Sequence, residues 1–174
     1  MIVFLDETGF SFHLGTGTTW APEGRTPLLR RVSQRRQVDT AIGLTLSGRI
    51  YKKHFDHAIH GADLVGLLRH LRSRVHGPMI LSWDRLQGHR SKPVQSLLAE
   101  HPESDVEWLP ASAPELNPEG DCPGKITQHM RNATPETEAE IREQADRGFA
   151  RLRRRPDLLL SFFHHAGLRV KRLI

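Results

Sequence analysis

The sequence has little cysteine and no long apolar run. Its 174 residues contain a single cysteine, Cys122. One cysteine cannot form an internal disulfide and has no second thiolate with which to build a zinc site, which fits a reducing compartment. No apolar stretch approaches the roughly 20 residues that cross a bilayer, and no basic N-terminal region precedes a long apolar segment. We therefore expect a cytoplasmic protein that does not enter a membrane.

The remaining composition is that of a soluble globular domain with an excess of positive charge. Hydrophobic residues make up 37% and charged residues 26% of a chain whose length suits one domain. The formal net charge is +5. Arginines concentrate in two stretches, which are Arg25, Arg30, Arg31, Arg35 and Arg36, and Arg147, Arg151, Arg153, Arg154 and Arg155. Such clusters either form solvated faces or neutralise the phosphates of a nucleic acid.

Hydrophobic periodicity predicts a mixed sheet flanked by helices, which is an α/β fold. The expected strands are 2–5, 38–46, 49–55, 79–81 and 106–109, with a hairpin turn at Ser47-Gly48. The expected helices are 63–75, 92–100, a long one that begins at Thr134-Pro135, and 157–165. Asp6 and Asp84 then fall at the C-terminal ends of two strands, where open α/β sheets usually carry their sites.

Three acidic residues have the spacing of a metal-dependent nuclease site. Asp6 and Asp84 each follow an apolar run, and Glu119 lies in a Pro-rich segment after the interval 85–118. Three carboxylates at strand ends can hold two divalent cations about 3.5–4 Å apart, which suits in-line attack on a phosphodiester. The side-chain period of two places Glu7 on the face opposite Asp6, so we expect Glu7 to be exposed to solvent, with support of the site's acids as the alternative.

Several motifs together resemble the catalytic domain of mariner-like bacterial insertion-sequence transposases. They are Phe4-Leu5-Asp6-Glu7-Thr8-Gly9-Phe10, the segment Thr19 to Pro27, Trp83-Asp84 with His89-Arg90-Ser91, and Ala113-Pro114-Glu115-Leu116-Asn117-Pro118-Glu119. The resemblance implies an RNase H-like fold and an Asp-Asp-Glu triad of Asp6, Asp84 and Glu119. It also implies Mg²⁺ or Mn²⁺ in a two-metal site, hydrolysis and transesterification at transposon ends, the DNA of those ends and of the target as partners, and a homodimer.

The sequence departs from that pattern in three places. Glu119 follows Pro118 directly, where the family has one intervening apolar residue, and the segment 120–125 contains Gly and Pro, so we expect Glu119 on a loop with Asp121 as a substitute ligand. Arg85 replaces the usual Asn and either competes for the Asp84 carboxylate or contacts a DNA phosphate. We expect residues 1–174 to form one catalytic domain without the N-terminal helix-turn-helix that reads the inverted repeats.

These patterns predict a DDE-type transposase catalytic domain that cleaves and transfers DNA strands and joins the nucleoid when bound to DNA. The expected DNA contacts are Arg85, His89, Arg90, Arg153, Arg154 and Arg155, with His89 alternatively supporting the acids. Trp20 is expected to pack against the domain rather than stack on a base. Two other functions remain open. One is an inactive remnant of a decayed or frameshifted transposase that keeps its fold and non-specific DNA binding, and the other is a stand-alone nuclease of RNase H type.

Overall fold

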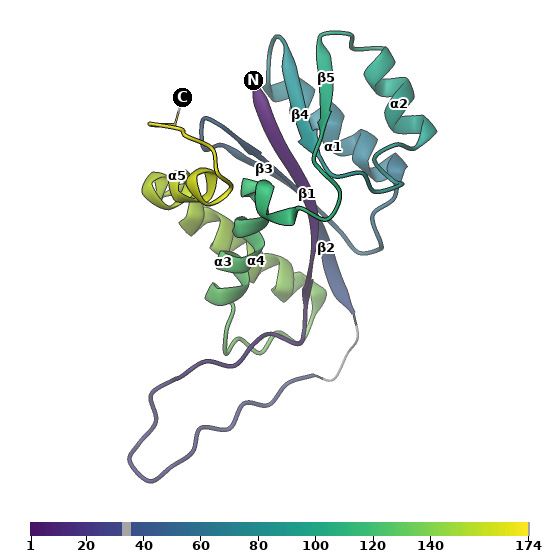
Figure 1. Ribbon diagram of the computed structural model, residues 1–174. Coiled ribbons are helices and arrows are strands. Elements are labelled where there is room, and N and C mark those ends of the chain that lie inside the picture. The colour runs from purple at the N-terminus through teal and green to yellow at the C-terminus, as the bar shows by residue number, and fades with distance from the viewer. Residues whose placement is uncertain (33–35, 174) are drawn as a thin grey trace.

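A five-stranded mixed sheet forms the centre of the computed structural model, which describes residues 1–32 and 36–173 (Figure 1). The strands are β1 (Ile2–Ser11), β2 (Gln37–Thr45), β3 (Ile50–Phe55), β4 (Met79–Trp83) and β5 (Ser104–Trp108). Their order is β3-β2-β1-β4-β5, with β1 antiparallel to β2 and parallel to β4. β3 is antiparallel to β2, and β5 is parallel to β4. The predicted mixed sheet is confirmed, with β1 at its centre.

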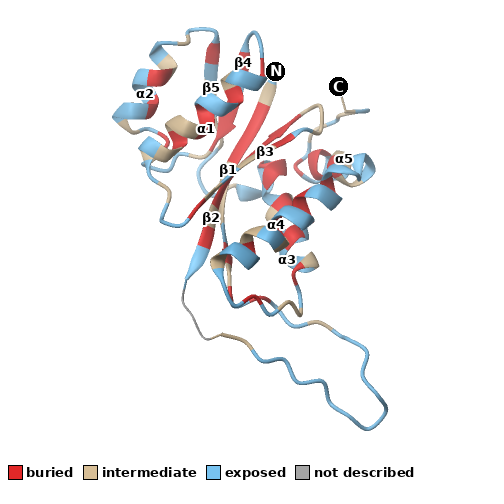
Figure 2. Cartoon of the chain, turned by 180° about the vertical axis from the view of Figure 1, so that it is seen from behind, coloured by how far each residue is buried: buried red, intermediate tan, exposed pale blue. Residues whose placement is uncertain are grey.

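Helices cover both faces of this sheet (Figure 2). They are α1 (Gly61–Arg74), α2 (Lys92–Ala99), α3 (Asp121–His129), α4 (Glu138–Arg153) and α5 (Pro156–His165). Successive side chains of a strand point to opposite faces. Val3 and Leu5 therefore join a core cluster with the apolar residues of α1 and α2, whereas Phe4 and Phe10 join a second cluster with those of α3, α4 and α5. The two cores hold β1 rigidly between the two helical layers.

The predicted hairpin and first two helices are found close to their expected bounds. β2 and β3 are joined by a tight turn in which Gly48 has a φ of 74°, a left-handed conformation that glycine adopts without strain. The α1 side chains Leu64, Leu67, Leu68 and Leu71 are buried at helical spacing, as their period predicts. The C-terminal helix, predicted at 157–165, is α5 and begins one residue earlier at Pro156.

The prediction that the segment after Glu119 is not helical was wrong. A short 3₁₀ turn, η2 (Pro118–Gly120), leads directly into α3. Pro123 is the third residue of α3, and the first four N–H groups of a helix have no partner within it, so proline removes no hydrogen bond there. Cys122 and Ile126, one helical turn apart, are both buried and hold α3 against the sheet.

The start of the long helix is also later than predicted. α4 begins after Thr137, not at Thr134-Pro135. The Thr137 hydroxyl accepts a hydrogen bond from the N–H of Glu140, and the Glu140 carboxylate accepts one from the N–H of Glu136. This reciprocal arrangement satisfies two N–H groups at the helix start, which Thr134 and Pro135 cannot do.

The described part of the connection between β1 and β2 extends away from the body of the domain (Figure 1). Its base is held by Gly17 and Asn132, which bond each other through both backbone groups of Gly17. Trp20 is 99% exposed, so the prediction that it packs against the domain was wrong. Arg35 of the first arginine cluster lies outside the described residues. Within the described ranges, no helix is long and apolar enough to span a membrane.

Candidate active site

The pairing of β1 with β4 brings Asp6 and Asp84 to one place. Their parallel register matches Ile2 with Ile80 and Phe4 with Ser82. β4 ends at Trp83, so Asp84 lies just beyond its end, whereas β1 continues to Ser11 and carries Asp6 in its middle. Asp6 therefore does not close its strand, as the sequence suggested, but lies where the neighbouring strand stops. Both acids line a hollow of about 300 Å³, whose other walls include Arg85, Leu86, residues 109–114 and Asn117.

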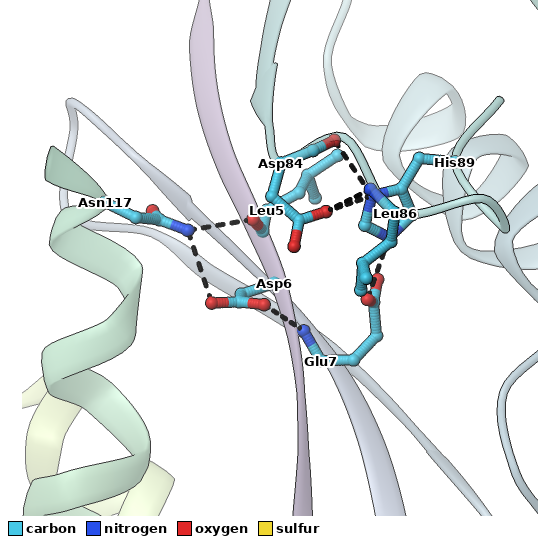
Figure 3. Close-up of polar contacts among 7 residues, drawn as sticks. All are labelled: Leu5, Asp6, Glu7, Asp84, Leu86, His89 and Asn117. Carbon is cyan, nitrogen blue, oxygen red and sulfur yellow. Dashed lines mark hydrogen bonds and ion pairs between the residues drawn. The ribbon is translucent and has the colours of Figure 1, made fainter. Parts of the chain in front are cut away.

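The Asp6 carboxylate is only partly supplied with hydrogen bonds (Figure 3). Its Oδ1 accepts from the N–H of Glu7 at 2.8 Å, and its Oδ2 lies 3.4 Å from the amide nitrogen of Asn117. Burial, together with the nearby charges of Glu7 and Asp84, raises the pKa of Asp6 from 3.8 to about 6, although the Glu7 N–H opposes the shift. A cation beside Asp6 would reverse this effect, because it favours the charged form.

Asn117 fastens the Pro-rich segment to the central strand. Its side-chain nitrogen donates to the carbonyl of Leu5 at 3.0 Å, and its side-chain oxygen accepts from the N–H of Glu119 at 3.2 Å. Asn117 thus caps the η2 turn and fixes Glu119 relative to β1. This role was not predicted, although the Asn of the Leu116-Asn117-Pro118 motif is the feature that could have indicated it.

Glu119 lies inside the protein and does not line the hollow. It is 0% exposed, and among the described residues neither carboxylate oxygen has a hydrogen-bond partner. Burial, followed by the charges of Asp6 and Glu7, raises the pKa of Glu119 well above its usual range. Asn117 connects Glu119 with Asp6, because its side-chain oxygen accepts from the Glu119 N–H and its side-chain nitrogen lies 3.4 Å from Oδ2 of Asp6. Asp121, considered a substitute, instead pairs with His165 at 2.9 Å.

The donor set suits a hard divalent cation, with oxygen ligands of the kind that Mg²⁺ and Mn²⁺ take. Asp6 and Asp84 face one hollow, and the two Glu119 oxygens lack any partner in the described structure. In the part of the chain described, however, no three acidic, His or Cys side chains converge in a metal-binding arrangement. The residues thus fit a cation at Asp6 and Asp84, and Glu119 must shift to join them.

His89 links the loop after β4 to the central strand. It is 2% exposed, and its Nδ1 lies 2.6 Å from Oδ1 of Asp84 while its Nε2 lies 2.8 Å from Oε2 of Glu7. Burial lowers the pKa of His89, but the hydrogen bond and charge of Glu7 and the contacts with Asp84 outweigh it, so the pKa is raised. Glu7 was expected to be exposed to solvent; its side chain is only 18% exposed and reaches His89.

The other residues expected to contact DNA are spread over the molecule. Arg85 and Arg90 are exposed, and Arg85 lines the hollow beside the two acids. His89 is buried with both ring nitrogens engaged, which leaves a supporting role rather than a phosphate contact in this conformation. Arg153 donates to the carbonyl of Ile50, and Arg155 forms two hydrogen bonds with Asp157. Arg153 therefore connects α4 to β3, whereas the contact of Arg155 is local to the start of α5.

With this geometry established, comparison with known proteins defines the class of protein. The sequence profile of the DDE superfamily endonucleases matches residues 1–142, so the chain belongs to that family. No curated protein sequence matched the chain. The fold is RNase H-like, as the solved structures below show.

Particular solved structures share this fold along nearly the whole chain. The Mos1 mariner paired-end complex with Mn gives a TM-score of 0.68 at 18% identity, covering 95% of this chain and 53% of that one. The Mos1 transposase catalytic domain with raltegravir and Mn gives 0.60 at 17% identity, covering 98% and 84%. A simian T-cell lymphotropic virus intasome gives 0.53 at 11% identity, covering 83% and 46%. The chain thus spans about half the length of the Mos1 chains in the paired-end complexes.

Proposed function

We propose that this chain is a transposase catalytic domain that cleaves DNA at the ends of a bacterial insertion sequence and joins those ends to target DNA. The observation that carries the proposal is the meeting of Asp6 and Asp84 at one hollow in a DDE-family domain. Asp6, Asp84 and Glu119 would hold Mg²⁺ or Mn²⁺, the two metals with which Mos1 paired-end complexes were solved. Bound cations activate an attacking oxygen and stabilise the leaving one.

The protein's own residues would prepare this chemistry. Asn117 and the N–H of Glu7 hold the Asp6 carboxylate on the rigid central strand. Arg85, at the edge of the hollow, is placed to bind a phosphate beside the acids, whose charges would otherwise repel DNA. Because two ends must be processed together, we propose that two copies act as a homodimer.

We also propose a phosphate-binding surface along the edge strand β3. A hollow of about 550 Å³ is lined by Arg49, Ile50, Tyr51, Lys52, His70, Arg74 and Arg153, and its described lining contains no acidic residue. These basic groups come from the hairpin, α1 and α4, so the fold gathers charges that are far apart in sequence. Contacts of this kind bind DNA through its backbone and carry no base sequence.

The metal-dependent activity is tested with Asp84→Asn and the matched control Asp105→Asn, which removes an exposed carboxylate from β5. DNA carrying the element ends should be cleaved by the wild type and the control in Mn²⁺ and not by Asp84→Asn. Mn²⁺ should also raise the melting temperature of the wild type and the control alone, because it binds the native state. Equal cleavage by Asp84→Asn would disprove the proposed site.

DNA binding is tested with the pair Arg49→Ala and Arg74→Ala against the control pair Lys171→Ala and Arg172→Ala, which changes the net charge equally. Fluorescence anisotropy should show that the Arg49→Ala, Arg74→Ala variant binds two unrelated DNA duplexes more weakly than the wild type. The slope of its log binding constant against log salt concentration should be smaller in magnitude by about 1–2. Equal salt dependence of binding for the two double variants would show that the phosphate-binding surface does not contact DNA.

The second candidate function is an inactive remnant that keeps the fold and binds DNA without cutting it. The observation that favours it is the burial of Glu119 away from the hollow. A remnant should show the Mn²⁺-dependent rise in melting temperature from Asp6 and Asp84 but no cleavage of any DNA. Metal-dependent cleavage abolished by Glu119→Gln would rule this candidate out.

A further inference from the structure

His89 occupies a position between two of the acidic residues and against an aromatic ring. Its imidazole stacks on the indole of Trp83, with ring centroids 3.9 Å apart and planes inclined by 23°. Its two nitrogens approach the carboxylates of Asp84 and Glu7 at 2.6 and 2.8 Å (Figure 3). Since both partners are acceptors, both ring nitrogens donate. The ring thus has its plane fixed by Trp83 and its rotation fixed by Glu7.

Asp84 needs such support because no strand holds it. It follows the last residue of β4, and its side chain is 42% exposed. The N–H of Leu86 donates to Oδ1 of Asp84, and Nδ1 of His89 donates to the Asp84 backbone carbonyl at 3.1 Å while lying 2.6 Å from the same Oδ1. In the described structure this leaves Oδ2 of Asp84 for a ligand in the hollow. Without His89, only the turn at Leu86 would restrict the carboxylate.

We propose that His89 is a positioning residue that fixes the Asp84 carboxylate for cation binding and ties it through Glu7 to the strand carrying Asp6. The inference rests on the proposed function, because it assumes that Asp84 binds the metal. Groups that orient a metal-binding side chain typically change metal affinity by about 10–100-fold when they are removed.

Two substitutions of His89 separate positioning from packing. The amide nitrogen of asparagine falls near the place of Nδ1, so His89→Asn keeps a donor for Asp84 and loses the one for Glu7. Glutamine reaches the place of Nε2, so His89→Gln keeps the donor for Glu7 and loses the one for Asp84. Both variants lose the stacked ring on Trp83, which makes each the control for the other.

The measurement is the dissociation constant of Mn²⁺ by isothermal titration calorimetry, with melting temperatures in EDTA. We expect His89→Gln to weaken Mn²⁺ binding by about 10–100-fold and His89→Asn by clearly less, at similar metal-free melting temperatures. Equal weakening by both variants, or none, would overturn the positioning role. Glu7→Met leaves His89 in place and should weaken binding to an intermediate degree, so it provides the same test if the His89 variants fail to fold. No Mn²⁺ binding by the wild type would refute the proposed function itself.

Discussion

Replacing Asp6 with asparagine is expected to stabilise the metal-free protein at neutral pH and to have little effect near pH 4. The folded-state pKa of Asp6 is raised from 3.8 to about 6 by burial and by the charges of Glu7 and Asp84. Between these values the unfolded chain gives up its proton while the folded protein retains it. The free energy of unfolding therefore falls as pH rises through this window, and the full penalty is present above pH 6.

The size of the effect follows from the shift. One pKa unit corresponds to about 1.36 kcal/mol, so a shift from 3.8 to about 6 corresponds to about 3 kcal/mol for a fully buried group. Asp6 faces the hollow, where water screens it, which reduces the expected penalty to about 1–2 kcal/mol. The amide oxygen of asparagine can still accept from the N–H of Glu7, so little is lost in exchange. For a chain of this length the melting temperature should rise by about 2–8 °C at pH 7.

The assay is differential scanning calorimetry in EDTA at pH values from 4 to 7.5, with Asp105→Asn as the exposed control. The difference between Asp6→Asn and the wild type should grow with pH up to about 6 and then level off, while the control shows no such trend. Mn²⁺ at pH 7 should stabilise the wild type and have little effect on Asp6→Asn. A difference that is the same at every pH, or a variant less stable than the wild type at pH 7, would refute the reasoning.

Three further substitutions test the fold around the site. Gly148→Ala should lower stability by about 1–3 kcal/mol despite the better helix propensity of alanine, because a Cβ there would lie 2.9 Å from Ile126; thermal unfolding checks this. Thr137→Ala should cost about 1 kcal/mol by removing the cap of α4, with Thr134→Ala as a control that changes little in urea unfolding. Glu119→Leu should stabilise the metal-free protein by about 1–3 kcal/mol, because it removes two buried oxygens that have no partner in the described structure. An unchanged or lower melting temperature for that variant would show that Glu119 is satisfied in solution.

Local patterns in the sequence predicted most of the sheet, because its strands contain apolar segments bounded by turn residues. The same reasoning located the hairpin and the two strands, β1 and β4, that bring Asp6 and Asp84 to the site. It misplaced Asp6 at a strand end, since the polar stretch Asp6-Glu7-Thr8 looks like a turn. Antiparallel pairing with β2 extends β1 to Ser11, so Asp6 lies in the middle of the strand. The pairing partner, not the strand's own composition, sets its length.

Two errors have a different origin, in how helices begin. Gly and Pro after Glu119 led to the prediction of a loop, yet both lie in the first turn of α3, where a helix tolerates them. Burial of Cys122 and Ile126 stabilises the helix. The Thr137-to-Glu140 spacing is a capping-box pattern visible in the sequence, and it favours a helix start at Thr137 over one at Thr134-Pro135. Support of the acids by His89 was one of its two expected roles, but its contact with Glu7 could not be predicted. Glu7 is 82 positions away in sequence, and only the fold brings the two together.

Asp6 interacts with both of the other acids of the proposed triad, Asp84 and Glu119. Asp84 lines the same hollow as Asp6, and the pKa of Glu119 is raised first by burial and then by the charge of Asp6. A cation between Asp6 and Asp84 would neutralise the charge of Asp6, which after burial contributes most to the raised pKa of Glu119. Binding of the first ion would then favour ionisation of Glu119 and its approach to a second ion. The central strand thereby couples the two positions, so loss of Asp6 should abolish both, whereas loss of Glu119 should leave the first ion bound.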